Sequence, residues 1–180
     1  GHGPHVEPNN KKVALLIALL ALVLAFSETL GKSAQTAALT HNIEASNLWS
    51  FFQAKTIRMT TLRTAAESME TTPDLSDTAK AQVAKWKAAA ARYDSEPETR
   101  EGRKELSARA LEQEAKRNRA MAAYHHYEFA SALIQIAIVL SSAMIITGIA
   151  ALGWGSVALG VLGIVFSGIG FFAPTAVHLF

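Results

Sequence analysis

Residues 13–26 read VALLIALLALVLAF, an apolar run that contains no charged residue. Ala and Leu dominate this run, and both are strong helix formers. A helix needs roughly 20 apolar residues to cross the hydrocarbon core of a bilayer. The run reaches that length if it extends from Lys12 to Gly31, so residues 12–31 are predicted to form a first transmembrane helix.

Two further stretches, 128–153 and 156–173, are almost free of charge. Nearly all the charged residues lie between positions 32 and 128. Charged residues make up 18% of the 180 residues and hydrophobic residues 50%, whereas soluble domains approach a quarter charged. The second stretch can span a bilayer with tilt, and the third suits a thin or locally adapted one. We therefore predict three transmembrane helices, with residues 1–11 and 174–180 as tails.

The first run has a second interpretation. Lys11 and Lys12 before an apolar core are also typical of a signal peptide. The small-residue cleavage sites after the run are weak, and we expect a retained membrane anchor. The chain contains no cysteine, which excludes disulfides and thiol catalysis without settling the compartment.

Residues 32–127 show helix patterns and no good strand. Alternating steps of four and three residues indicate a coiled-coil-like seam. Its members are Ala34, Ala38, His41, Ala45, Leu48, Phe52, Lys55, Met59, Leu62, Ala66 and Met69. His41 and Lys55 interrupt the apolar line, either as inward polar residues that set the register or as outward side chains. Ile43, Phe51 and Ile57 widen the apolar face, which suggests contact with more than one neighbour.

Two boundaries divide this segment. Thr72 is a plausible N-cap followed by Pro73, and Ser95 with Glu98 fits a capping box. Between them, residues 75–93 carry apolar side chains at helical spacing. We expect the first helix to continue through Gly31 and the last to continue into the second membrane span. Each would then be roughly 80 Å long. A kink at Gly31 with a compact three-helix cap is the alternative.

The C-terminal part is predicted to be a tight membrane hairpin with its turn at residues 153–156, where Trp154 suits the membrane interface. Small residues recur at four-residue spacing and would let helix backbones approach closely. The residues expected to pack helices together are Ala143, Thr147, Ala151, Ser156, Gly160, Gly163 and Ser167.

Polar residues gather where the first and second membrane helices meet the middle segment. We expect one polar layer there, with Glu28 beside Gln135 and with His125 or His126 beside Glu128. An ionisable residue in a membrane helix is a candidate for a proton or ion path. An interfacial belt is the simpler interpretation, with Glu28 and Lys32 as a helix pair. The layer comprises Glu28, Lys32, Tyr124, His125, His126, Glu128 and Gln135.

Several function classes are not supported. Gly31-Lys32-Ser33 resembles the end of a phosphate-binding loop, but Phe26 stands where that loop needs a glycine, and no strand precedes it. No nucleophile–base pair, carboxylate dyad or cofactor loop is apparent, so we expect neither an enzyme nor a bound cofactor or metal. No pattern indicates nucleic acid. Basic residues near the membrane, which could contact anionic lipid, are Lys116, Arg117 and Arg119.

Short stretches along nearly the whole chain resemble the bacterial domain of unknown function 4337 family. They are KVALLIA (12–18), GKSAQT (31–36), NIEASNLW (42–49), FQAKTIR (52–58), RYDSEP (92–97) and YHHYE (124–128). The resemblance implies a small bacterial membrane protein. It implies no activity, and it assigns no functional residue.

The expected architecture is an all-α membrane protein with a helical, coiled-coil-like hairpin, residues 32–127, outside the bilayer between the first and second spans. Four basic residues lie near the membrane on the hairpin side (Lys32, Lys116, Arg117 and Arg119), against two on the other side (Lys11 and Lys12), which favours a cytoplasmic hairpin. The first helix, however, often dominates the orientation. We expect a multi-pass protein of the bacterial inner membrane. Its function is predicted to be an oligomeric scaffold or an accessory subunit of a membrane assembly. The alternative is a homo-oligomeric ion or proton channel or transporter that uses Glu28 and Gln135.

Overall fold

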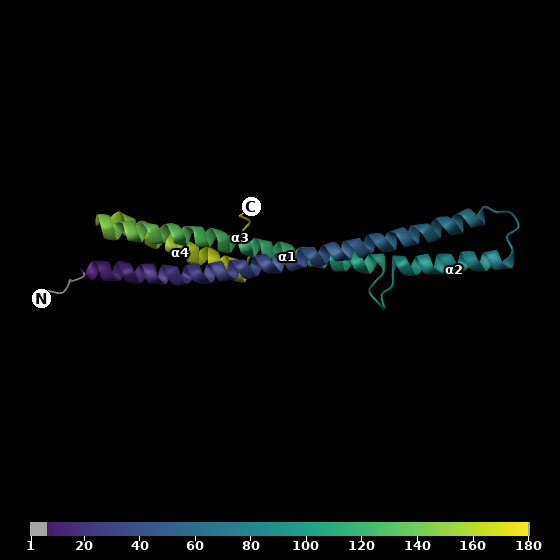
Figure 1. The fold of residues 1–180 in the computed structure, drawn as a ribbon, viewed down its shortest axis with the longest axis horizontal. Coiled ribbons are helices and arrows are strands. Elements are labelled where there is room, and N and C mark those ends of the chain that lie inside the picture. Colours follow the sequence, from purple (N-terminus) through teal and green to yellow (C-terminus); the bar gives the residue numbers. More distant parts are fainter. Residues whose placement is uncertain (1–6, 180) are drawn as a thin grey trace. The chain divides into compact units, whose positions relative to one another are not determined.

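The computed structural model describes residues 7–179. In this range the chain forms four α-helices and no strand: α1 (Pro8–Glu70), α2 (Asp77–Asp94), α3 (Arg103–Thr147) and α4 (Ala150–Phe172). Figure 1 shows these helices joined by short connections. By length and composition, α1, α3 and α4 are each able to cross a membrane. The prediction of an all-helical chain with three such helices is therefore confirmed.

The chain divides into two compact units. The terminal unit comprises residues 1–38 and 118–180, and the middle unit comprises residues 39–117. Helices α1 and α3 each contribute to both units, because neither is interrupted where the units divide. The expected continuity of the first helix through Gly31 is confirmed.

The core of the terminal unit lies among α1, α3 and α4. Leu20 of α1 packs with Ile134 and Ala137 of α3, and Leu159 of α4 covers this cluster. Gly160 and Gly163 are buried on α4. A Cβ atom on Gly160 would stand 2.7 Å from the end of the Leu20 side chain, so a larger residue here would require Leu20 to move.

Serine hydroxyls join the same three helices. Ser27 of α1 and Ser167 of α4 share a hydrogen bond of 2.8 Å. Ser156 of α4 donates to the carbonyl oxygen of Ala137 at 2.7 Å and also contacts the hydroxyl of Ser141. Among the residues expected to pack helices, those on α4 from Ser156 onward therefore lie against neighbouring helices. Ala143 is half-buried, whereas Thr147 and Ala151 are exposed beside the turn between α3 and α4.

The position of that turn differs from the sequence prediction. It lies at Gly148–Ile149, so a single helix over 128–153 and a turn at 153–156 are both wrong. Gly148 has a φ of 69°, a left-handed conformation that favours glycine at a helix end. Gly153 and Gly155 instead face Met144 and Leu140 of α3, where they allow close packing.

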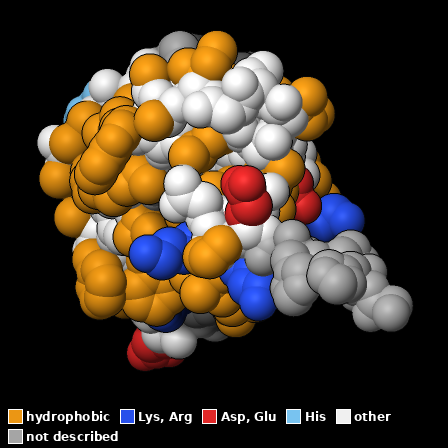
Figure 2. Space-filling model, turned by 90° about the vertical axis from the view of Figure 1, so that its left-hand side faces the viewer, with side chains coloured by type: hydrophobic (Ala, Val, Ile, Leu, Met, Phe, Trp, Pro, Cys, Tyr) orange, Lys and Arg blue, Asp and Glu red, His pale blue; other side chains and the backbone are white. Residues whose placement is uncertain are grey.

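The terminal unit exposes many large apolar side chains. Leu15, Phe26 and Val139 are exposed by 62%, 63% and 66%, and Ile146 by 85%. Figure 2 shows hydrophobic side chains over much of the face seen there, with several charged groups between them. Soluble monomers rarely present such extensive apolar surface. This exposure is the expected outer surface of helices that lie in a bilayer.

The middle unit buries the register predicted for α1. Leu48 packs on Leu106 and Ala110 of α3, with Trp49 and Phe52 against the cluster. Along the same line Ala45, Lys55, Met59 and Ala66 are buried, and His41, Phe52, Leu62 and Met69 are half-buried. The apolar spacing thus identifies the inward side of this part of α1.

Both polar members of the register face inward and have partners. The Nδ1 atom of His41 lies 2.7 Å from Oε1 of Gln113. The ammonium of Lys55 lies 5.2 Å from the ring centre of Phe51 and 5.3 Å from that of Tyr93, within the range of cation–π attraction. The alternative in which these two side chains point outward is wrong.

Both predicted helix starts in the middle unit are also wrong. Helix α2 begins at Asp77, not at Pro73, because the hydroxyl of Ser76 accepts a hydrogen bond from the backbone N–H of Ala79 at 3.2 Å. Residues 71–76 form a loop in which Asp74 has a φ of 53°. A left-handed residue cannot continue an α-helix, so the cap lies after it.

The second predicted start, at Ser95 and Pro97, lies in another loop. Ser95 ends α2, with its N–H bonded to the carbonyl oxygen of Ala91 at 3.0 Å, and α3 begins only at Arg103. Arg100 has a φ of 58°, a left-handed conformation that prevents the loop from continuing either helix. A Cβ atom on Gly102 would overlap the backbone of Ser95 and Glu96. The loop therefore folds back tightly onto the first turn of α3.

Candidate functional site

The candidate site is a polar cleft in the terminal unit, between α1 and α3. Both helices are apolar here except for short polar stretches, 27–35 on α1 and 124–135 on α3. The helices come close at Gly31, where a Cβ atom would be 3.4 Å from Cβ of Tyr127. The absence of a side chain at Gly31 thus leaves room for the longer polar side chains on either side of it.

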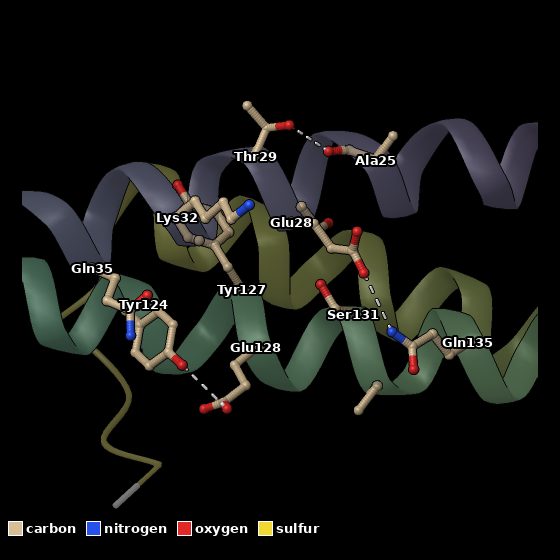
Figure 3. A pocket seen from close by; sticks show the side chains of 13 residues that line it. Ala25, Glu28, Thr29, Lys32, Gln35, Tyr124, Tyr127, Glu128, Ser131 and Gln135 are labelled. Carbon is tan, nitrogen blue, oxygen red and sulfur yellow. Dashed lines mark hydrogen bonds between the residues drawn. The ribbon is translucent and has the colours of Figure 1, made fainter.

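The cleft has a volume of about 640 Å³ and opens to the surface. Polar side chains from both helices line the cleft, and in Figure 3 those of Glu28 and Gln135 point toward one another. On α1 they are Ser27, Glu28, Thr29, Lys32 and Gln35; on α3 they are Tyr124, Tyr127, Glu128, Ser131 and Gln135.

One end of the cleft is formed by Glu28 and Gln135. The Nε2 atom of Gln135 donates a hydrogen bond to Oε1 of Glu28 at 3.4 Å (Figure 3). Both side chains are exposed, and Ser131, one turn earlier on α3, is buried. The pairing of Glu28 with Gln135 that the sequence predicts is therefore present.

The other end is formed by Tyr124 and Glu128. The hydroxyl of Tyr124 donates to Oε1 of Glu128 at 3.3 Å (Figure 3). Nδ1 of His125 lies 3.8 Å from Oε2 of the same carboxylate. Of the two histidines considered as partners of Glu128, the structure therefore selects His125.

His126 lies outside the cleft. Its ring is buried and approaches Phe166 of α4, with 6.2 Å between ring centres. Its Nδ1 atom lies 2.7 Å from the carbonyl oxygen of Ala122, and Nε2 has no hydrogen-bond partner among residues 7–179. Adjacent helix positions diverge by about 100°, which is why His126 cannot share the surroundings of His125. Including His126 in the polar layer was wrong.

Lys32 lines the cleft one helical turn from Glu28. Within the described part of the chain, no carboxylate lies within ion-pair distance of its ammonium. The helix pair of Glu28 with Lys32 that the sequence suggests is thus not formed. The cleft contains an unpaired cation close to carboxylates that are themselves only weakly bonded.

Sequence reasoning missed Gln35 and Tyr127 as part of this site. Gln35 follows Lys32 by three residues and Glu28 by seven, so it shares their side of α1. That spacing is visible in the sequence. The sequence does not distinguish Tyr127 from the polar residues on either side of it. Its burial against Gly31 in the structure identifies it as part of the cleft wall.

The lining of the cleft combines hydrogen-bond acceptors with hydrogen-bond donors. It offers carboxylate, amide and hydroxyl oxygens as acceptors, and an ammonium, amides and hydroxyls as donors. In residues 7–179 there is no cluster of three or more His, Asp or Glu side chains that would hold a metal ion.

These features define an α-helical protein with three helices able to cross a membrane and a polar cleft between two of them. The model of one protein family, described as a domain of unknown function (DUF4337), matches residues 9–173. The chain belongs to this family. No curated protein and no solved structure matches it.

Proposed function

We propose that this chain is a membrane-anchored, non-enzymatic scaffold that associates with copies of itself through its middle unit. The observation that carries the proposal is a second apolar line on α1. Leu39, Ile43 and Ile57 are exposed by 59%, 61% and 66%, although they belong to the unit that we place outside the membrane.

The second line lies opposite the buried one. With about 100° per residue, Leu39, Ile43 and Ile57 fall within about 40° of one another, and Leu48 lies about 180° from Leu39. One side of α1 is therefore covered by α2 and α3, whereas Leu39, Ile43 and Ile57 on the opposite side are exposed among the described residues. A helix that is apolar on two sides is typical of a position between two neighbours.

The residues between these apolar side chains favour a second helix of the same kind. Ser46, Ser50, Thr61 and Thr64 lie on the same line, which carries no charge. The hydroxyl of Ser50 donates to the carbonyl oxygen of Ser46, and that of Thr61 to Ile57. Since these hydroxyls have backbone partners, the line presents small, uncharged surface. A two-fold axis could place it against its own copy.

The mass of the full chain, extracted gently with retained lipid, tests this proposal by native mass spectrometry. The proposal expects a homo-oligomer that falls to monomers in the double variant Ile43→Glu and Ile57→Glu. Asn47→Glu is the control, because Asn47 is exposed on the same helix but about 80° from Leu39. An unchanged mass in the double variant contradicts the proposal. One copy bound to a large, different protein would instead indicate an accessory subunit.

The membrane placement belongs to the same proposal. We place residues 12–31, 128–147 and 150–172 in the inner membrane of a bacterium, with residues 32–127 as a coiled-coil-like hairpin in the cytoplasm. Lys116, Arg117 and Arg119 would then contact anionic lipid near the surface. Labelling a cysteine introduced at Glu98 from either side of the membrane tests the orientation.

A second candidate is a channel or transporter, which the contact between Glu28 and Gln135 favours. In a closed ring of chains these polar groups would face a shared path. Glu28→Gln should then abolish ion or proton flux while the oligomer mass is unchanged. Flux equal to that of the original protein in reconstituted vesicles excludes this candidate.

A further inference from the structure

The carboxylate of Glu28, in the polar cleft of the terminal unit, lies beside exposed apolar side chains. Glu28 is exposed on α1, and Ala25, which lines the same cleft about one turn earlier, is exposed as well. On α3, Val139 lies one turn after the exposed Gln135 and is 66% exposed. These apolar side chains are expected to face lipid. A carboxylate among them is costly unless it has a hydrogen-bonding or charged partner.

The chain itself supplies only a weak partner. The bond from Gln135 to Glu28 is 3.4 Å long, beyond the usual 2.7–3.2 Å of N–H···O hydrogen bonds. The nearby cation, Lys32, forms no ion pair within the described residues. A carboxylate and an ammonium therefore remain available to the same cleft, one helical turn apart.

The charge of the cleft selects the class of ligand. Glu28 and Glu128 give two negative charges against one positive charge from Lys32. A purely anionic group would meet net repulsion. A zwitterion that carries an ammonium and a phosphate matches both signs, with its ammonium toward a carboxylate and its phosphate toward Lys32.

The lining also distinguishes two kinds of ammonium. Carboxylate, amide and tyrosine oxygens accept hydrogen bonds, which a primary ammonium can donate and a quaternary one cannot. Quaternary ammonium groups are recognised by cages of aromatic faces. Here the aromatic side chains of the lining are Tyr124 and Tyr127, and Tyr127 is buried.

We propose that this cleft binds the headgroup of a phospholipid with a primary ammonium, of the phosphatidylethanolamine type. The cleft volume of about 640 Å³ falls within the range of small-molecule sites. Val139, exposed one turn beyond Gln135, provides apolar surface along which an acyl chain would continue from the cleft. The inference is independent of self-association, because it uses no contact of the middle unit.

Native mass spectrometry of the full chain tests this site. The protein is exchanged into micelles that contain phosphatidylethanolamine or phosphatidylcholine with identical acyl chains. We expect retention of phosphatidylethanolamine to exceed that of phosphatidylcholine about fivefold or more, the effect of one or two charge-assisted hydrogen bonds. The preference should vanish in the double variant Glu28→Gln and Lys32→Gln.

The matched control is Glu112→Gln with Lys116→Gln, which removes another Glu–Lys pair at the same spacing on α3. Helix content and elution volume report whether each variant folds. If the Glu28 and Lys32 variant does not, Tyr124→Phe removes the hydroxyl that binds Glu128 and should weaken the preference while keeping the ring.

Two results would overturn the proposal. One is equal retention of the two lipids by the original protein, and the other is an unchanged preference in the cleft variants. Free phosphoethanolamine provides a third arm. If it binds as tightly as the lipid when no lipid is present, the site belongs to a soluble zwitterion and the assignment to a lipid is wrong.

Discussion

The hydroxyl of Ser95, the residue that follows α2, donates a hydrogen bond of 2.6 Å to Oε1 of Glu105 in the first turn of α3. The other oxygen of this carboxylate accepts from the backbone N–H of Glu96 at 3.1 Å. The side chain of Glu105 thus binds the loop between α2 and α3 at two consecutive residues, Ser95 and Glu96. A carboxylate near the start of a helix also interacts favourably with the helix dipole.

This relationship predicts a pH dependence. The Ser95 hydroxyl holds the pKa of Glu105 below its ordinary value of 4.5. A carboxyl with a lowered pKa contributes stability that is present above its unfolded-state pKa and is lost as the pH falls through its folded-state pKa. We expect Ser95→Ala to lower the melting temperature by a few degrees at pH 7 and to lessen the loss below pH 4.5.

Thermal unfolding of the full chain in detergent, followed by circular dichroism from pH 7 to pH 3, measures this effect. Ser107→Ala is the control, since the hydroxyl of Ser107 donates to the carbonyl oxygen of Lys104 in its own helix. Asp94 loses its ion pairs with Arg103 and Lys104 over a similar range in every variant, so the difference between variants is the informative quantity. Identical pH profiles for Ser95→Ala and the original protein would contradict the prediction.

The glycines of α4 provide a packing test. A Cβ atom on Gly163 would overlap the side chain of Ile134, whereas no atom lies within 4 Å of one placed on Gly168. Gly163→Val should therefore destabilise the terminal unit by about 1–3 kcal/mol, the usual cost of overpacking. Gly168→Val should change stability much less. Unfolding by sodium dodecyl sulfate measures both variants, and similar losses for the two would show that the contact with Ile134 has little weight.

The turn between α3 and α4 gives a conformational test. Gly148 has a φ of 69° and open space around its Cα atom, so a side chain would cost backbone strain and nothing else. Gly148→Val should destabilise the hairpin by roughly 1–2 kcal/mol. Gly148→Asn should cost less, because asparagine tolerates the left-handed region. Equal thermal stability of the Val and Asn variants would argue against a left-handed turn at this position.

The core of the middle unit gives a third stability test. Leu106 has no exposed surface and packs on Leu48, whereas Leu111, five residues later on α3, is 56% exposed. Leu106→Ala should cost about 2–5 kcal/mol through lost burial and the cavity left behind. Leu111→Ala should cost far less. The melting temperatures of the two variants measure this, and a comparable drop in both would place Leu111 in an interface.

The sequence predicted most of the fold because the signals involved are local and repeated. Apolar runs such as 13–26 are long enough to indicate helices that can cross a membrane, and alternating steps of three and four identified the inward residues of α1 in the middle unit. The pairing of Glu28 with Gln135 was predicted for a similar reason. Two antiparallel helices that leave the same unit bring residues at equal distances along them to the same level.

The incorrect predictions concern boundaries, where several local signals compete. Thr72 and Ser76 are both acceptable N-caps, and only the left-handed Asp74 between them decides in favour of Ser76. Ser95 and Glu98 match a capping box, but Ser95 bonds to Glu105 instead. Glycines at 148, 153 and 155 are equivalent as helix breakers in sequence, although only Gly148 forms the turn.

By itself, the sequence determined an all-helical chain, three helices suited to a membrane and the side of α1 that is buried, because hydrophobicity and helical period act over many residues at once. Only the tertiary structure decided that His125 and not His126 approaches Glu128, that Lys32 forms no ion pair with Glu28, and that Gly31 lies against Tyr127 at a polar cleft. These outcomes depend on the distance and rotation between helices that are far apart in sequence, and single contacts of that kind leave no periodic pattern.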